Sequence, residues 1–318
     1  MAELAIIIGN GFDKDLGLLS GYSDFVKGDE WKELEKTLGS FPTKDYLNHS
    51  LICHLQTEAY KKENWFDVEE EILQFIMNHP VCNEREIREI ESEFKRLKKA
   101  LKDYLIRVSS GYKMAETEFP YEFMRTLAAC PKKIVEINFN YTNPQDFLPT
   151  PVFFHPNSYN QTHVHGSLSE EEIVLGCDIQ NNQEVNRYLS FMYKYNMLNR
   201  ANHVARNLLE AKEIIFYGHS VNEMDFGYFR EFFKAASTAP KPIRHLTFIT
   251  LNEKSERRIK EAQFNSSVDA PPCDNYPNIV HRRYMKNGTS ATPCTCALKP
   301  LIFEFRDSAE AFECLSLK

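Results

Sequence analysis

The chain has 318 residues and a mass of 37.1 kDa, enough for one large hydrophobic core or two modest ones. Hydrophobic residues make up 42% and charged residues 26%, as in ordinary globular proteins, and the net charge of −7 leads us to expect no binding to nucleic acid. No apolar run is long enough to span a membrane and no signal peptide is evident, which predicts a cytoplasmic protein with reduced cysteines and no membrane partner.

The first predicted element is a strand that leads directly into a glycine turn. Leu4–Ile8 is a short apolar run rich in β-branched residues, the pattern of a strand buried on both faces. It runs into Gly9-Asn10-Gly11, and a helix can begin at Phe12. Such a turn lets backbone N–H groups approach a ligand, and the helix dipole favours a phosphate there. The same turn also opens other α/β domains, and it lacks the third glycine of the dinucleotide fingerprint, so both interpretations stay open.

Helical patterns follow from Glu30 to Leu127. The strongest pattern has apolar residues at steps of three and four among dense mixed charge, which predicts an amphipathic helix with a solvated outer face. Its apolar residues are Ile87, Ile90, Phe94, Leu97, Leu101 and Leu105. Shorter helices are predicted over 30–38, over 48–61 and from Asn64 onward. We therefore expect a helical insertion over residues 30–127 and an α/β domain formed by residues 1–29 and 128–318.

The remainder of the chain alternates strands with helices. The predicted strands cover 133–137, 173–176, 213–217, 245–250 and 301–305. The predicted helices cover 185–209, 226–236 and 253–263, a long loop covers 266–300, and a short helix ends the chain. This alternation predicts a Rossmann-like α/β fold with an open, mostly parallel sheet, in which ligands bind outside the carboxyl ends of the strands. Gly9–Gly11, Asn138–Thr142 and Gly218–Ser220 each follow a strand, so we expect them to meet at one rim.

Two pairs of polar residues expected at this rim have side chains suited to ligand binding or catalysis. Asn138 and Asn140 can hold a ligand hydroxyl or a water, or simply satisfy loop backbone groups, as asparagine often does in turns. His163 and His165 flank Val164, so both face one side of an extended segment, and histidine is the usual general base near neutral pH. A structural histidine and a metal ligand are the alternatives. Because no acidic or cysteine partner lies at characteristic spacing, we expect no metal.

The segment Gly218-His219-Ser220 has the same pattern as the first loop, a glycine at a strand end followed by hydrogen-bond donors. Asp225 lies just beyond it. Its carboxylate is suited either to accept hydrogen bonds from ribose hydroxyls or to cap the helix that follows.

Six motifs, taken in order, resemble the bacterial AbiH family of phage abortive-infection proteins, which is itself similar to sirtuin-like NAD-binding domains. The motifs are GNGFD, ENWFDVEEEI, NFNYT, HVHGSL, GHSVNEMDF and TFITLNE. The resemblance runs from Leu4 to Glu253 and depends, within the helical insertion, mainly on Trp65 and Glu69. It implies a sirtuin-like fold with NAD as its ligand.

The resemblance also implies roles for single residues. Gly9 and Gly11 fall where the family's first loop wraps the NAD diphosphate. Asn140 falls on the asparagine that positions water or the nicotinamide-side ribose, and His165 falls on the catalytic histidine. The loop Gly218–Ser220 falls where the adenosine-side ribose and phosphate are held. The residues expected to bind the nucleotide are Gly9, Asn10, Gly11, Phe12, Asp13, Tyr22, Asn138, His163, Gly218, His219, Ser220 and Asp225.

Two positions depart from the sirtuin pattern. Asp13 stands where sirtuins usually carry Ser or Thr, and a carboxylate beside a diphosphate is electrostatically unfavourable. Thr142 stands where an aspartate often follows the key asparagine. Both departures leave open a nucleotide other than NAD. Since no paired C-x-x-C lies between His165 and Gly218, the sirtuin zinc ribbon is missing and protein deacylation is not expected.

The leading hypothesis is an NAD glycohydrolase that acts as an antiphage effector and consumes NAD as its substrate. Asn140 would hold the incoming water while His165 accepts a proton. Such an enzyme must be silent without infection, which implies a phage-derived trigger or regulatory protein and a homo-oligomer. The alternative is a nucleotide-binding sensor or scaffold without turnover. A nuclease-like effector is disfavoured by the acidic charge and the lack of clustered carboxylates for a metal.

Overall fold

A computed structural model describes residues 2–38, 49–62, 66–79, 83–150, 154, 158–170, 173–177, 186–194, 201–221, 225, 227–229, 232, 244–250, 279–281 and 301–306. The chain divides into two compact units. The sheet unit comprises residues 1–18, 111–164 and 200–318, and the helical unit comprises residues 19–110 and 165–199. The helical unit thus includes 165–199 and excludes 111–127, whereas the sequence-based division takes 30–127 as the insertion.

The sheet unit contains a parallel sheet. Its described strands are β1 (Leu4–Ile8), β2 (Ile134–Asn138), β3 (Tyr159–His163), β4 (Glu213–Tyr217), β5 (Arg244–Ile249), β6 (Ile279–His281) and β7 (Leu301–Arg306). They lie in the order β3-β2-β1-β4-β5-β7-β6, and every pairing between neighbours is parallel. The predicted α/β fold with an open, mostly parallel sheet is confirmed.

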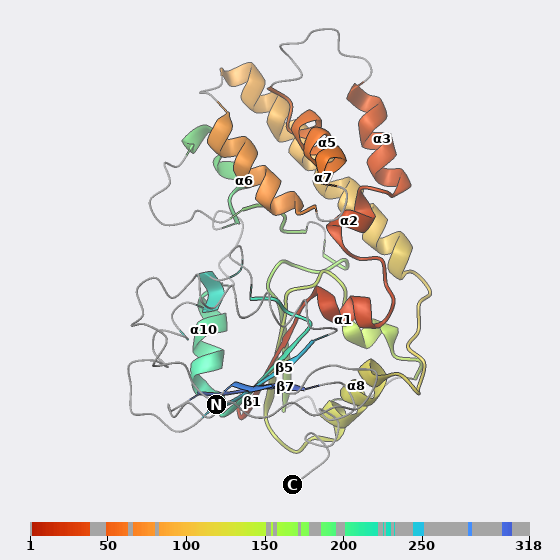
Figure 1. The fold of residues 1–318 in the computed structure, drawn as a ribbon, viewed down its shortest axis with the longest axis vertical. Coiled ribbons are helices and arrows are strands. Elements are labelled where there is room, and N and C mark those ends of the chain that lie inside the picture. Colours follow the sequence, from red (N-terminus) through yellow and green to blue (C-terminus); the bar gives the residue numbers. More distant parts are fainter. Residues whose placement is uncertain are drawn as a thin grey trace. The chain divides into compact units, whose positions relative to one another are not determined.

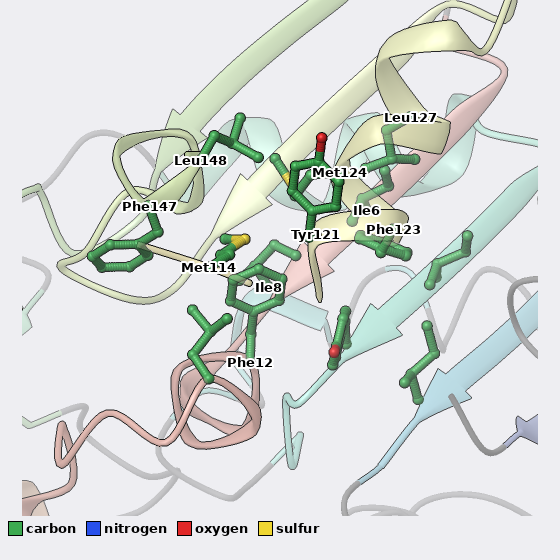
Figure 2. Packing of buried hydrophobic residues seen from close by; sticks show 14 of the residues in the cluster. Ile6, Ile8, Phe12, Met114, Tyr121, Phe123, Met124, Leu127, Phe147 and Leu148 are labelled. Atoms are coloured by element: carbon green, nitrogen blue, oxygen red, sulfur yellow. The ribbon is translucent and has the colours of Figure 1, made fainter. Parts of the chain in front are cut away.

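Helices pack on both faces of this sheet because alternate strand residues point to opposite sides. On one face, Ala5 and Ile7 of β1 belong to a core cluster with Val204 and Leu208 of α10 (Ala201–Glu210). On the other, Leu4, Ile6 and Ile8 pack with side chains of α1 (Asn10–Asp15) and α8 (Phe119–Ala129). Figure 2 shows this second cluster, in which Phe12 lies beside Ile8 and near Met114. All five residues of β1 are buried, as the apolar run predicts.

The helical unit contains the helices predicted for the insertion, which are α3 (Asp29–Leu38), α5 (Leu51–Lys61), α6 (Val68–Asn78) and α7 (Glu84–Ser109). It also contains α2 (Tyr22–Phe25), which was not predicted, and the 3-10 helix η2 (Arg187–Met192), which lies within the helix predicted over 185–209. The long α7 packs against α3, α5 and η2 (Figure 1). Its buried side chains include five of the six apolar residues of the predicted stripe, so that prediction is confirmed.

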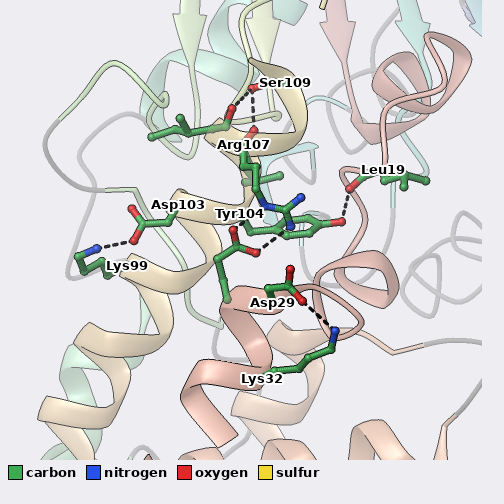
Figure 3. Close-up of polar contacts among 11 residues, drawn as sticks. Leu19, Asp29, Lys32, Lys99, Asp103, Tyr104, Arg107 and Ser109 are labelled. Atoms are coloured by element: carbon green, nitrogen blue, oxygen red, sulfur yellow. Dashed lines mark hydrogen bonds and ion pairs between the residues drawn. The ribbon is translucent and has the colours of Figure 1, made fainter. Parts of the chain in front are cut away.

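Polar contacts hold the C-terminal part of α7 to the start of the unit (Figure 3). The guanidinium of Arg107 donates to both carboxylate oxygens of Glu30 at 2.7 and 2.9 Å, and the hydroxyl of Tyr104 donates to the carbonyl of Leu19 at 2.7 Å. Burial raises the pKa of Tyr104 to about 12, so this hydroxyl keeps its proton and remains a donor. The 3-10 helix η1 (Pro144–Phe147) belongs instead to the sheet unit.

Three local predictions need correction or fall outside the described residues. Residues 173–176 form no strand, and only Cys177 makes an isolated bridge, with Tyr193. The loop predicted over 266–300 contains the short strand β6. Only residues 227–229 and 232 of the helix predicted over 226–236 are described, and all four are helical. The helix predicted over 253–263 and the final short helix lie outside the described residues.

Candidate functional site

The sheet unit has a topological switch point between β1 and β4. From β1 the chain adds β2 and β3 on one side, and it then returns to place β4 and β5 on the other side. In open parallel sheets the crevice outside the carboxyl ends of such strands is where ligands bind. The Gly9–Gly11 segment follows β1, with Gly9 at the N-cap of α1 and Asn10 and Gly11 in its first turn, so the helix begins two residues before the predicted Phe12. The Gly218–Ser220 loop follows β4, so both segments lie at this point.

Glycines let these two loops pack backbone against backbone. The N–H of Gly9 donates to the carbonyl of Tyr217 at 2.9 Å, and the N–H of Gly11 donates to that of Gly218 at 2.8 Å. A Cβ on Gly9 would lie 2.6 Å from the Cα of His219, and one on Gly11 would lie 2.5 Å from the Cα of Gly218. Close packing therefore explains the glycines, and the N–H groups of Gly9 and Gly11 are used within the protein.

The β2 loop joins this cluster through a buried hydrogen-bond network. The Nδ2 of Asn140 donates to the carbonyl of Gly9 at 3.1 Å and to Oδ1 of Asp13 at 3.0 Å. The hydroxyl of Thr142 lies 2.9 and 2.8 Å from the two carboxylate oxygens of Asp13. Asp13 is only 1% exposed. The three loops expected to meet at one rim do so.

This network fixes which atom Asn140 can offer. The amide nitrogen of Asn140 has two hydrogens. It donates one to the carbonyl of Gly9 and the other to the carboxylate of Asp13, both of which are acceptors, so both hydrogens are used. The same two acceptors fix which side-chain atom is the nitrogen. The carbonyl oxygen, Oδ1, is then the atom that can accept a hydrogen bond from a water or a hydroxyl.

Asn138 and His163 support the same loop. Oδ1 of Asn138 accepts from the backbone N–H of Asn140 at 2.8 Å, and its Nδ2 donates to the carbonyl of Thr142 at 3.0 Å. Asn138 thus satisfies loop backbone groups, which is the structural alternative considered for it. Nδ1 of His163 lies 3.1 Å from the carbonyl of Asn140.

The loop after β4 contains a strained turn. Gly218 has φ +67°, and Val221, a β-branched residue, has φ +50°. Nδ1 of His219 accepts from the N–H of Val221 at 2.9 Å, which puts the proton of a neutral ring on Nε2, 3.6 Å from Oδ2 of Asp225. Ser220 is half-buried in the same loop. Backbone strain of this kind concentrates at ligand sites and switch regions.

His165 lies in the helical unit, with different surroundings from His163. β3 ends at His163 and the chain bends at 164–165, so the two rings do not share one extended segment. Nε2 of His165 lies 3.4 Å from Nζ of Lys194, which in turn donates to Oε2 of Glu69 at 2.8 Å. All three side chains are buried. Tyr22, another predicted ligand residue, also belongs to this unit, in α2.

The sequence matches the family described as Bacteriophage abortive infection AbiH over residues 5–244, more than half of the chain. The chain belongs to the AbiH family. No curated protein matches it. The AbiH match includes every candidate residue of the three loops, and it also includes His165, Lys194 and Glu69. Trp65, the other insertion residue of the resemblance, lies outside the described residues.

Membership in AbiH supports a role in phage abortive infection. Among the described residues, no helix has both the length and the apolar character needed to cross a bilayer. The described part of the chain also brings no three His, Cys, Asp or Glu side chains together in a way that would hold a metal ion.

Sequence reasoning missed Lys194. Its side chain contacts Glu69 and His165, which are distant from it along the chain. The local sequence YKYNM carries no motif, so only the resemblance at Glu69 and His165 signals that this part of the chain matters.

Proposed function

We propose that this AbiH protein is an abortive-infection effector that hydrolyses NAD at the bond between nicotinamide and ribose. Family membership supports the role in abortive infection. The hydrolysis is supported by one observation above all, the fixed orientation of Asn140 at the switch point of the sheet.

Asn140 is prepared to position a water or a ribose hydroxyl. Both of its N–H groups are bonded to Gly9 and Asp13, so the amide does not reorient, and Oδ1 is the remaining acceptor. Breaking the nicotinamide–ribose bond passes through an oxocarbenium-like state, which a correctly placed water must trap. Holding that water before the bond breaks removes an entropic part of the barrier.

The remaining roles follow from the resemblance. His165 falls on the catalytic histidine of the resemblance and would act as the proton acceptor. With the N–H groups of Gly9 and Gly11 engaged, the diphosphate would be held by other groups of the loops, for which Asn10 and Ser220 are the candidates. Such an enzyme must be inactive before infection, which implies activation by a phage-derived trigger or control by a regulatory protein, and assembly as a homo-oligomer.

The test is NAD loss in cells that make the protein and are then infected with phage. Asn140→Ala and His165→Ala should each slow NAD loss by about a hundredfold or more. Asn160→Ala on the edge strand β3 and His203→Ala on α10 are matched controls, since both side chains are exposed, and they should leave NAD loss unchanged. If Asn140→Ala, folded by circular dichroism, depletes NAD as fast as the wild type, the proposal is wrong.

A second candidate function is a nucleotide-binding sensor or scaffold without turnover. The observation that favours it is the internal use of the Gly9 and Gly11 N–H groups, which hold two loops together without any ligand. Calorimetry with NAD and ADP-ribose, followed by analysis of the products, separates the two. Binding of NAD that returns NAD intact supports the sensor, and release of nicotinamide supports the enzyme.

A further inference from the structure

The helical unit buries a lysine beside the histidine to which the proposed function assigns proton transfer. Lys194 is 1% exposed, although a buried ammonium costs several kcal/mol in lost hydration. Its charge is balanced by Glu69 of α6, with Nζ 2.8 Å from Oε2. An ion pair alone needs no histidine, yet Nε2 of His165 lies 3.4 Å from the same Nζ.

The contact between Lys194 and His165 determines where the ring carries its proton. An ammonium group has donors and no acceptor. Nε2 must therefore present its lone pair to Lys194, and the proton of the neutral imidazole must lie on Nδ1. The positive charge of Lys194 also opposes a second positive charge on the adjacent ring. Glu69, in turn, favours the charged form of the lysine.

We propose that Lys194 is a positioning residue that holds His165 as the neutral, Nδ1-protonated imidazole, with Glu69 holding the lysine in place. This inference depends on the proposed function only for its consequence in NAD hydrolysis. A ring locked in one tautomer and kept neutral is ready to exchange a proton near neutral pH. A ring that can become protonated or change its tautomer is, for part of the time, in a form that cannot accept a proton at the required nitrogen.

The tautomer of His165 is measured directly by long-range ¹H–¹⁵N correlation of the histidine rings at pH 7, with His165→Gln identifying its signals among those of the ten histidines. In the wild-type protein His165 should show one protonated nitrogen, Nδ1. The opposite tautomer or an imidazolium would overturn the proposal, and the tautomer itself is read on the wild-type protein.

The paired substitution Glu69→Gln with Lys194→Met removes both charges together and so leaves no buried ion alone. We expect His165 to lose its fixed tautomer and shift towards the Nε2-protonated form that free imidazole side chains prefer. The matched control is Lys62→Met with Glu71→Gln, an ion pair whose buried carboxylate also lies on α6. In the control the tautomer of His165 should not change.

NAD loss in infected cells gives the second readout. The paired Glu69 and Lys194 variant should be at least about tenfold slower than the wild type, and the Lys62 and Glu71 control should not differ. If the tautomer changes in the paired variant but no protein, the wild type included, depletes NAD, the NAD hydrolase is refuted and the positioning role stands. An unchanged tautomer in the paired variant would refute the positioning role itself.

Discussion

Asp13 and Thr142 are the two residues at which the sequence departs from the sirtuin pattern, and the structure joins them by hydrogen bonds. The pattern has a hydroxyl at the first position and a carboxylate at the second, and this chain has the reverse. Relative to the positions that the resemblance implies, the hydroxyl and the carboxylate are exchanged, and in this chain they bond to each other. The carboxylate of Asp13 is directed at Thr142 and Asn140, so its presence in the first loop does not by itself argue against a nucleotide.

The exchange predicts the outcome of a double-mutant cycle. Asp13→Ser should destabilise the protein by about 1–3 kcal/mol, because buried donors lose their acceptor. Thr142→Asp should also destabilise it, because it puts two carboxylates in contact. The double variant restores the pair in reverse, so we expect a favourable coupling of about 1–3 kcal/mol in chemical unfolding. Additive effects of the two substitutions would contradict the exchange.

Glu136 of β2 predicts a pH dependence of stability. It is fully buried and accepts from Tyr159 and from Gln161, but burial dominates and raises its pKa above the ordinary value of 4.5. Between the ordinary and the raised pKa the unfolded chain ionises first, so this group's contribution to stability is lost as pH rises. The loss amounts to about 1.4 kcal/mol for each unit between the two pKa values.

Glu136→Gln removes this titration while keeping the size of the side chain. Relative to the wild type, the variant should gain melting temperature as pH rises above 4.5, the ordinary pKa of the carboxyl. The exposed Glu210→Gln on α10 serves as the control and should show no such trend. A wild-type protein that becomes more stable relative to Glu136→Gln as pH rises would contradict the raised pKa.

At the scale of single residues, the candidate site is only partly predictable from the sequence. The three loops could be placed at one rim because each follows a strand, and that geometry holds whatever the side chains. What the side chains do there depends on partners distant in sequence. Asn140 gains its fixed orientation from Asp13 and Gly9, and His165 gains its lysine from a segment without any motif.

Among the elements, the loop after β4 depends most on its glycine. Gly218 has φ +67°, and a Cβ there would overlap the backbone N of Phe12. Gly17 has φ +77° with nothing within 4 Å of the same position. Gly218→Ala should therefore lower the free energy of unfolding by clearly more than the roughly 1–2 kcal/mol expected for Gly17→Ala from backbone conformation alone. If Gly218→Ala and Gly17→Ala lower the free energy of urea unfolding equally, the loop after β4 can move away from the loop after β1 at little cost in free energy.

Strands were predictable where burial on both faces made them continuously apolar. β1 and β4 are of this kind, and β4 has the predicted bounds. β3 was not predicted, because its sequence YNQTH is polar and it lies at the edge of the sheet with no fully buried residue. Ile173 and Leu175 are buried in the helical unit without strand pairing, so an apolar pattern there indicated burial and not a strand.

At the scale of the whole molecule, each unit has buried side chains of its own. Leu97 of α7 and Leu208 of α10 are both fully buried, one in the helical unit and one in the sheet unit. Leu97→Ala and Leu208→Ala should each cost about 2–5 kcal/mol. Hydrogen exchange should rise first within the unit that carries the substitution, so each variant is the control of the other. Equal rises throughout the chain in both variants would show a single cooperative unit.

The division of the chain into two units could not be predicted from which segments have a helical pattern. α8 is helical in pattern, yet it packs on the sheet through Phe123, Met124 and Leu127. Segment 165–199 follows the sheet strand β3 in sequence, yet it groups with the helices. Unit membership is decided by contacts between distant segments, and periodicity within a segment carries no information about them.

The hydrogen bond from Gly11 to Gly218 has a consequence for biosynthesis. A ribosome releases β1 early and β4 only after the segments that contain β2, β3 and α10 have been translated. A nascent chain that terminates before Gly218 therefore lacks the carbonyl that accepts from the Gly11 amide and lacks the second loop of the rim. In a protein of abortive infection, truncated translation products accordingly lack an assembled loop cluster.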